Sequence, residues 1–367
     1  MGFFLDFYRR ITNKTFEQTW ELFDWSGDEE FVKGKVVALV QNGADINGTN
    51  YSETLMRKYD ALYNDTPLAL ALKHHQFSSA EYLVENGAKN NDKTPYANKH
   101  FCYLVELHNK YVKMEEMKKN GLDDPLMRFD KVFKQGDLEK MEHLMDTMLK
   151  KGFSVQEAVP HFCEKSTDIE YMTDALTLAA GAGNLRLVKF LHEKGAPINR
   201  EEMSAFGHAK YKSAMVAAAA SDNFDVLRYL KENGGKINPE HLSFKEPSPL
   251  SKAVMNKDEA AADFLLENGA DVNLPTNKRN WTPLMYAAAL GDEAEASKWV
   301  DKLLAYGADA TVRNIDGETA SQIAQRLYNK ETLSQKLAIV AKKQQNQHRQ
   351  EVGALHDNLA MYANDGR

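Results

Sequence analysis

The amino-acid sequence predicts an all-α solenoid of stacked helix-turn-helix units, and three recurring patterns favour this fold class. A phrase that contains glycine recurs along the chain, as in QNGADIN (41–47), ENGADVN (267–273) and AYGADAT (305–311). A Thr-Pro-Leu or Ser-Pro-Leu start precedes it, as in TPLALAL (66–72) and TPLMYAA (282–288). Between the two signals, apolar residues follow helical spacing. One such unit cannot bury its apolar face alone, so we expect the units to stack.

Each signal has a physical reason to begin or end a helix. A Thr or Ser side chain caps free backbone N–H groups, and proline fits the first helical turn, where its missing donor costs nothing. Alanine runs such as VAAAA (216–220) let a neighbouring helix approach closely. The glycine of the recurring phrase takes the left-handed conformation that ends a helix. The predicted stop glycines are Gly43, Gly87, Gly121, Gly152, Gly195, Gly234, Gly269 and Gly307.

Three units are longer than the others by four residues. Twelve residues separate the inter-helix break from the stop glycine in most units, as between Lys257 and Gly269. The three units that begin Gly-Asp have sixteen, at 27–43, 136–152 and 291–307. Four residues make about one helical turn, so they can lengthen the second helix without moving its apolar face. We predict three long second helices, with a longer inter-helix loop as the alternative.

The units resemble ankyrin repeats, whose pattern includes T-P-L-H-x-A-A in the first helix and L-L-x-x-G-A-x-x-N after the second. The best match runs from Trp281 to Thr311. Ala69, Ser251 and Met285 stand where the pattern has histidine, and Ala320 replaces proline in the last restart. The resemblance is strong over 174–325, good over 31–90 and weak over 91–173. It implies an ankyrin-repeat α-solenoid with loop or β-turn fingers between the units.

The sequence also predicts a division into three segments. Residues 1–15 are expected to form an N-terminal capping segment, rich in aromatic residues. Residues 16–345 are expected to form the repeat domain of about eight units, degenerate at 91–173. Residues 346–367 are expected to form a polar C-terminal tail.

Composition narrows the classes of partner and compartment. The formal net charge is −7 and the isoelectric point is about 5.9, which argues against duplex nucleic acid as the ligand. Two cysteines do not describe a disulfide-stapled secreted domain, so we expect a reducing, cytoplasmic location. Translocation into the cytosol of a host cell is the alternative. No apolar run approaches the length of a membrane span, and we expect a monomer.

We expect no catalytic residue, metal or cofactor. The triplet HFC occurs at 100–102 and again at 161–163, and two His with two Cys could make a zinc site. Zinc motifs, however, pair their ligands at other spacings, so Cys102 and Cys163 are interpreted as packing residues. The chain lacks the P-loop, nucleophile-elbow and HExxH motifs.

The resemblance implies a non-catalytic interaction module or scaffold that binds a protein partner. Two alternatives stay open: a bacterial effector that acts on host proteins, and an enzyme or toxin activity in the degenerate region 91–173. Helix pairs stacked continuously through that region would favour the scaffold, and a pocket of convergent polar groups would favour the enzyme.

In the ankyrin family, partners contact the loop tips and first helices, which form a concave face. Aromatic residues and arginine are the side chains most enriched in binding hot spots. Trp281 is the strongest single candidate, because it precedes the capping residue Thr282. For each Tyr or Phe, packing within its own loop is the competing interpretation. The predicted partner-binding residues are Tyr51, Arg57, Tyr59, Tyr63, Phe206, Tyr211, Phe244, Lys278, Arg279 and Trp281.

Overall fold

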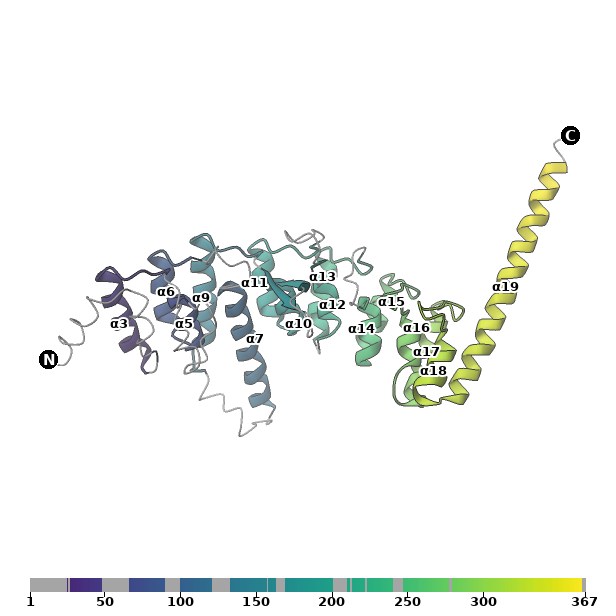
Figure 1. Ribbon diagram of the computed structural model, residues 1–367, viewed down its shortest axis with the longest axis horizontal. Coiled ribbons are helices and arrows are strands. Elements are labelled where there is room, and N and C mark those ends of the chain that lie inside the picture. Colours follow the sequence, from purple (N-terminus) through teal and green to yellow (C-terminus); the bar gives the residue numbers. More distant parts are fainter. Residues whose placement is uncertain are drawn as a thin grey trace. The chain divides into compact units, whose positions relative to one another are not determined.

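The computed structural model of the chain is mostly helical, with a few short strands (Figure 1). It divides into two compact halves, an N-terminal half (Met1–Pro197) and a C-terminal half (Ile198–Arg367). The structure describes residues 25, 27–47, 66–89, 100–120, 133–156, 158–162, 169–200, 210–211, 213–221, 223–239, 247–276 and 279–364.

The helices of the N-terminal half stack in two rows. The first helices of the units are α5 (Pro67–Lys73), α7 (His100–Lys119) and α10 (Ala175–Gly181), and α7 packs against both of the others. The second helices are α3 (Glu29–Gln41), α6 (Phe77–Glu85), α9 (Asp137–Lys150) and α11 (Leu185–Glu193). In this row α6 packs against both α3 and α9, and each first helix contacts the second helix of its own unit.

The C-terminal half repeats the arrangement. Its first helices are α12 (Ala214–Ala218), α14 (Pro249–Asn256), α16 (Pro283–Ala288) and α18 (Ala320–Tyr328), and each packs against the next. Its second helices are α13 (Phe224–Glu232), α15 (Glu259–Glu267), α17 (Glu293–Ala305) and α19 (Glu331–Asn364). Here α13 contacts α15, and α17 contacts α19. The predicted all-α solenoid is therefore confirmed.

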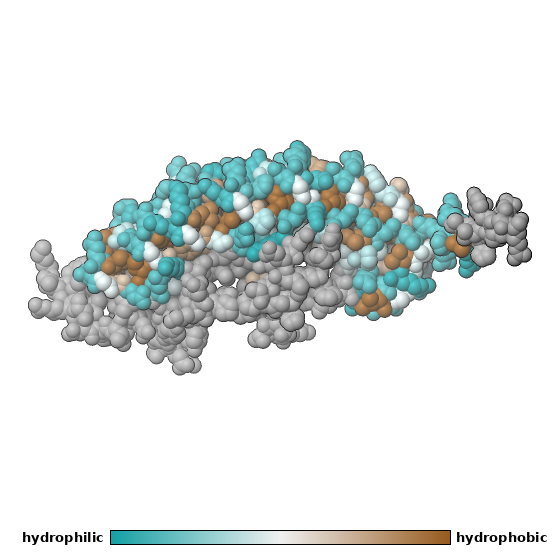
Figure 2. Space-filling view, turned by 90° about the horizontal axis from the view of Figure 1, so that it is seen from above, coloured by the Kyte–Doolittle hydropathy of each residue, from teal (hydrophilic) through white to brown (hydrophobic). Residues whose placement is uncertain are grey.

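Small residues in the first helices and leucines in the second helices form the core. Ala217 and Ala287 of the first helices are buried, as are Leu230, Leu265 and Leu303 of the second helices. Alanine leaves the backbones of stacked first helices close together, and leucine fills the space between the rows. On the face seen in Figure 2, the coloured residues are mostly hydrophilic, with separate hydrophobic patches between them.

The predicted start and stop signals act as expected. The side chains of Thr66, Ser248 and Thr282 accept hydrogen bonds from the backbone N–H three residues later, at 3.2, 3.0 and 3.4 Å, with proline at the next position. The described stop glycines all have positive φ, for example 84° at Gly269 and 88° at Gly307. Local side-chain and backbone chemistry thus defines the ends of these helices.

The extra residues of three units lengthen the second helix, so the alternative of a longer loop is wrong. Helices α3 and α17 have 13 residues and α9 has 14, whereas α6, α11, α13 and α15 have 9 each. Asp28 and Asp292 cap α3 and α17, but α9 begins at Asp137 itself, with Gly136 as its cap at φ 86°. This shift accounts for the additional residue of α9.

The glutamate that begins α3 and α17 also serves the next unit. The carboxylate of Glu29 accepts hydrogen bonds from the backbone N–H and the hydroxyl of Ser78, at 2.7 and 2.9 Å, and pairs with Lys140. The carboxylate of Glu293 accepts from the backbone N–H of Leu333 at 3.0 Å. Each glutamate therefore satisfies a free donor at the start of the neighbouring second helix.

The weakly repetitive region forms one long helix pair followed by a hairpin. Helix α7 is 20 residues long and pairs with α9 as the first helix of one unit. It ends at Lys119, two residues before Gly121, so the helix that precedes this predicted stop is a first helix and not a second one. Gly121 itself lies outside the described residues. Strands β1 (Ala158–Phe162) and β2 (Ile169–Asp174) then pair in antiparallel fashion, with an irregularity between His161 and Phe162. A further short strand, β3, covers Lys210–Tyr211.

The asparagine that ends the recurring phrase links each unit to the next. The amide of Asn238 donates to the carbonyl oxygen of Gly269 at 2.8 Å, and its Oδ1 accepts from the N–H of Asp271 at 2.8 Å. Asn199 contacts Gly234 and Lys236, Asn273 contacts Gly307 and Asp309, and Asn47 contacts Gly87 and Lys89 in the same way. The side-chain amide thereby satisfies a backbone carbonyl oxygen and a backbone N–H at the end of the next unit's second helix.

Helix α19 continues across the predicted boundary between repeat domain and tail. It has 34 residues and contacts α17 and α18 through its first part, where Leu333 and Leu337 are buried. The side-chain amide of Gln344 makes a similar link between units, because it donates to the carbonyl oxygen of Ala308 at 2.9 Å. The boundary at 345/346 stays a prediction. Among the described helices, none combines the length and the apolar character that a membrane crossing requires.

Candidate partner-binding surface

Two consecutive fingers of the C-terminal half form the candidate surface. The first, between α15 and α16, closes through a pair of backbone hydrogen bonds between Thr276 and Trp281, at 2.9 and 2.8 Å. Arg279 is exposed at its turn, and Asn280 beside it has a φ of 54°. Asparagine tolerates this left-handed conformation better than most residues, which suits it to a tight turn.

The second finger, between α17 and α18, is organised by one buried asparagine. Oδ1 of Asn314 accepts hydrogen bonds from the backbone N–H groups of Asp316 and Glu318, at 3.0 and 2.8 Å. Gly317 has a φ of 76°, so the turn requires a residue that enters the left-handed region. The N–H of Asn314 in turn donates to the carbonyl oxygen of Glu318 at 3.0 Å. Together these bonds hold Ile315 and Asp316 at the tip.

The two tips are joined to each other. The backbone N–H of Ile315 donates to the carbonyl oxygen of Arg279 at 3.1 Å. The side chain of Ile315 is 62% exposed, and Arg279 and Arg313 are exposed as well. We call Arg279, Trp281, Arg313, Ile315 and Asp316 the joined fingers.

Trp281 anchors the first finger on the helix that follows. Its ring lies edge-on to Tyr286 of α16, with ring centroids 5.3 Å apart and planes at 62°. Both side chains are half-buried. The indole Nε1 of Trp281 is buried and has no hydrogen-bond partner among the residues that the structure describes. Trp281 therefore packs against Tyr286 and remains partly exposed.

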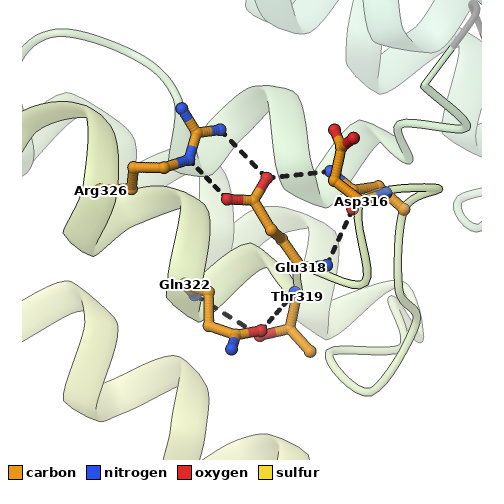
Figure 3. A network of polar contacts seen from close by, with 6 residues as sticks. Asp316, Glu318, Thr319, Gln322 and Arg326 are labelled. Atoms are coloured by element: carbon orange, nitrogen blue, oxygen red, sulfur yellow. Dashed lines mark hydrogen bonds and ion pairs between the residues drawn. The ribbon is translucent and has the colours of Figure 1, made fainter.

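A bidentate ion pair neutralises the acidic residue at the base of the second finger. Figure 3 shows the guanidinium of Arg326 facing the carboxylate of Glu318, which it contacts through two nitrogens, Nη2 at 3.1 Å. The hydrogen bond from Arg326 holds the pKa of Glu318 below its ordinary value, against the effect of partial burial. Asn314 and the charge of Arg279 lower the same pKa further. In addition, Thr319 and Gln322 form a capping box at the start of α18.

Only part of the predicted site lies within the described residues. Arg279 and Trp281 are described with their side chains, and they share one finger. Tyr211 lies in β3, without a described side chain. Tyr51, Arg57, Tyr59, Tyr63, Phe206, Phe244 and Lys278 lie outside the described residues.

Sequence reasoning missed Ile315, Arg313 and Tyr286. The predicted residues are aromatic or basic, whereas Ile315 is an aliphatic residue in a short finger. Its exposure follows from the turn that Asn314 organises, and the N-I-D-G sequence is the signal that could have found it, since Asn, Asp and Gly favour turns.

Buried histidines in the degenerate region serve packing. His100 is 2% exposed, and its Nε2 lies 2.9 Å from the hydroxyl oxygen of Thr66. Burial lowers its pKa to about 3, so the ring is neutral. Burial also lowers the pKa of His108, although the hydrogen bond with Glu142 opposes this effect, and Nδ1 of His108 lies 3.0 Å from Nδ2 of Asn184. Both histidines thus join α7 to neighbouring units.

The described residues contain no group of three or more His, Cys, Asp and Glu side chains arranged to hold a metal ion. Cys102 is buried in α7, while His161 of the second triplet lies in β1. Cys163 lies outside the described residues, so the proposed pairing of the triplets is not tested.

Comparisons with known proteins identify the repeat. Residues 214–314 match the family model for ankyrin repeats in three copies. The chain is 30% identical over 156 residues to the ankyrin repeat and KH domain-containing protein mask-1 of Caenorhabditis elegans. This match covers 41% of the chain but only 6% of that much longer protein. The crystal structure of the human ASB11 ankyrin repeat domain is similar with a TM-score of 0.48 and 18% identity, over 74% of this chain and 98% of that one.

Proposed function

We propose that this chain, which belongs to the ankyrin-repeat protein family, is a non-catalytic module that binds a protein partner through the joined fingers. The main support for this proposal is the backbone hydrogen bond between Ile315 and Arg279. It holds residues of two repeat units together in one exposed surface. Arginine and tryptophan beside an exposed aliphatic residue make the mixed composition that binding hot spots favour.

The packing of the degenerate region supports a scaffold over an enzyme. Helix α7 contacts both α5 and α10, so the stacking of first helices continues from α5 through α7 to α10. Its buried histidines are engaged with Thr66 and Asn184 of neighbouring units and with Glu142 of α9. An effector role in a host cell rests on composition and resemblance, and a cytoplasmic location rests on the low number of cysteines.

The test is the loss of partner binding in a finger variant that stays folded. Affinity purification with the full chain, followed by mass spectrometry, supplies candidate partners, and calorimetry with the purified partner measures the affinity. Trp281→Ala is expected to weaken binding by at least about 1 kcal/mol. Tyr306→Ala is the matched control, because Tyr306 is 46% exposed at the far end of α17.

A second pair of variants guards against misfolding. If Trp281→Ala unfolds the protein, Trp281 belongs to the core, and Arg279→Ala tests the surface instead. Arg228→Ala in α13 then serves as the control for an exposed arginine. Partner binding that survives both Trp281→Ala and Arg279→Ala contradicts the proposal.

A further inference from the structure

A continuous chain of hydrogen bonds joins two repeat units of the N-terminal half around His108, a fully buried residue of α7. Nδ1 of His108 lies 3.0 Å from Nδ2 of Asn184, the residue before α11, and Nε2 lies 3.2 Å from Oε1 of Glu142 in α9. Nη2 of Arg186 in α11 contacts the other carboxylate oxygen of Glu142 at 2.6 Å. The α7–α9 unit and the α10–α11 unit therefore meet at one imidazole ring.

The orientation of the Asn184 amide follows from its backbone partner. Its Oδ1 accepts a hydrogen bond from the backbone N–H of Leu187 at 3.1 Å, which caps α11. A backbone N–H can only donate, so Oδ1 and Nδ2 of Asn184 cannot be exchanged. Nδ2 then gives one hydrogen to Nδ1 of His108 and the other to Oδ1 of Asn109, each at 3.0 Å. The amide of Asn109 in turn donates to the carbonyl oxygen of Leu178 in α10 at 3.2 Å.

These contacts fix the protonation of the His108 ring. Nδ1 accepts from Asn184 and carries no proton, so the one proton of the neutral ring lies on Nε2, which donates to Glu142. A second proton can bind only at Nδ1, where it would face an N–H of Asn184. A rotated Asn184 amide would accept this proton but would lose the N–H of Leu187. Each arrangement of a charged ring thus costs a hydrogen bond at the junction.

The surroundings of His108 decide the effect of pH. Burial lowers the pKa of His108 below its ordinary value of 6.5, the carboxylate of Glu142 opposes this effect, and the charge of Arg186 adds to it. Helix α10 has no titratable side chain, and the one in α5 is Lys73, which is also positive. Tyr111, one turn along α7, has a pKa raised above 10.0 by burial and stays neutral. Opening of the junction therefore takes up a proton, and it becomes easier as the pH falls below about 6.5.

We propose that the contacts of His108 form an acid-sensitive junction, at which a proton bound to Nδ1 loosens the α10–α11 unit from α7 and α9. The proton comes from solvent and binds the free electron pair of Nδ1 once the hydrogen bond from Asn184 breaks. The first turn of α11 then loses the side chain that holds its cap in place. This inference goes beyond the proposed function, because it concerns the response of the repeat stack to pH and needs no partner.

Hydrogen–deuterium exchange of the full chain at pH 7 and pH 5 tests the junction, with rates corrected for the chemical effect of pH. Peptides that cover α10 and α11 are expected to exchange at least about threefold and at most about thirtyfold faster at pH 5, because opening takes up one proton. Peptides that cover α16, which the hydroxyl of Thr282 caps, are the internal control and should not change. Equal protection of α10 and α11 at both pH values overturns the proposal, as does an equal loss of protection in every helix pair.

Variants assign the effect to one proton site. His108→Asn cannot take up the proton, and the oxygen of its amide replaces Nδ1 as the acceptor for Asn184. It is expected to abolish the pH dependence in α11. His143→Asn, at an exposed histidine of α9, is the matched control and should behave like the wild type. A pH effect that persists in His108→Asn overturns the proposal.

Asn184→Asp carries the test if His108→Asn does not fold. The carboxylate still accepts from the N–H of Leu187, but it presents an acceptor to Nδ1 of His108, so a charged ring becomes the favoured partner. Exchange in α11 is then expected to be slower at pH 5 than at pH 7. A variant that keeps the wild-type direction contradicts the proposal.

Heteronuclear NMR of the imidazole nitrogens measures the ring directly. At pH 7 the full chain should show a proton on Nε2 of His108 and none on Nδ1, and the signals missing in Asn184→Asp or His108→Asn identify this ring. A proton on Nδ1 at pH 7 overturns the proposal.

Discussion

The side chain of Asn238 bonds to the backbone of Gly269 and of Asp271, which end the second helix of the next repeat unit. Its amide donates to the carbonyl oxygen of Gly269, and its Oδ1 accepts from the N–H of Asp271, each at 2.8 Å. One side chain thus bonds both a backbone acceptor and a backbone donor across a unit boundary. This relationship explains why the recurring phrase ends in asparagine, a residue that carries a donor and an acceptor side by side.

Asn238→Ala is therefore expected to destabilise the protein by about 1–2 kcal/mol, because two hydrogen bonds between neighbouring units are lost. Urea unfolding followed by circular dichroism measures the change in midpoint. Asn346→Ala, at an exposed position of α19, is the control and should be neutral. Equal effects at the two positions would show that the link contributes nothing.

Gly269→Ala is expected to cost about 1–2 kcal/mol, because a Cβ disfavours the left-handed backbone. The φ of Gly269 is 84° and a Cβ there would meet no atom within 4 Å, so the cost is conformational alone. Gly34→Ala is the matched control, since Gly34 lies inside α3 with equally open surroundings and no positive φ. That change should stabilise the protein by about 0.5–1 kcal/mol. Urea midpoints that shift in the same direction for both variants would contradict the argument.

Thr282→Ala is expected to lower the free energy of unfolding by about 1 kcal/mol, because the hydroxyl that caps α16 is lost. Thr282→Ser keeps the cap and is expected to retain most of the stability. The two variants are compared in denaturant melts. A Ser variant as unstable as the Ala variant would assign the effect to packing of the buried methyl group instead.

Stability is expected to fall as the pH drops from about 6.5 towards 3, with His100 as one contributor. Burial lowers the pKa of His100 to about 3 in the folded chain, whereas the ordinary pKa is 6.5. Above that range both states hold a neutral ring, and within it only the unfolded state binds the proton. The slope from this residue is at most about 1.4 kcal/mol per pH unit.

His100→Asn should make the pH dependence shallower, although it also removes a buried ring. Urea unfolding at pH 7 and pH 5 gives the difference in free energy for each protein. His348→Asn, at an exposed position of α19, is the control. An unchanged difference in the His100 variant would show that the ring takes up a proton in the folded state.

Treatment with a chelator is expected to leave thermal unfolding unchanged. Cys102 is buried in α7, and the described residues offer no cluster of metal ligands. Differential scanning calorimetry before and after EDTA measures the effect. A thermal midpoint that EDTA lowers and zinc restores would instead support a zinc site formed by the two HFC triplets.

The helix boundaries could be predicted because their causes are local. Thr66, Ser248 and Thr282 cap helices whose first N–H groups lie within three residues of the hydroxyl, and the stop glycines act through their own φ. The length of α17 followed from counting residues, since one added turn leaves the apolar face in place. None of these helix ends or lengths depends on a contact with a distant segment.

The structure of the degenerate region was harder to predict, because contacts with distant residues determine it. The glycine at position 121 was predicted to end a second helix; α7 does end two residues before it, at Lys119, but α7 lies in the row of first helices and contacts α5 and α10. His100 and Thr66 are 34 positions apart, and His108 and Asn184 are 76 apart. Contacts with distant units, rather than a local signal, therefore show that α7 belongs to the row of first helices.

The sequence by itself determined the repeating unit, its helix ends and its three long second helices, because capping, left-handed glycine and helical periodicity act within a few residues. Only the tertiary structure decided which finger residues meet. Arg279 and Ile315 are 36 positions apart, and their contact depends on the offset between two stacked units. The packing of α16, α17 and α18 against one another sets this offset, and no local sequence pattern specifies that packing.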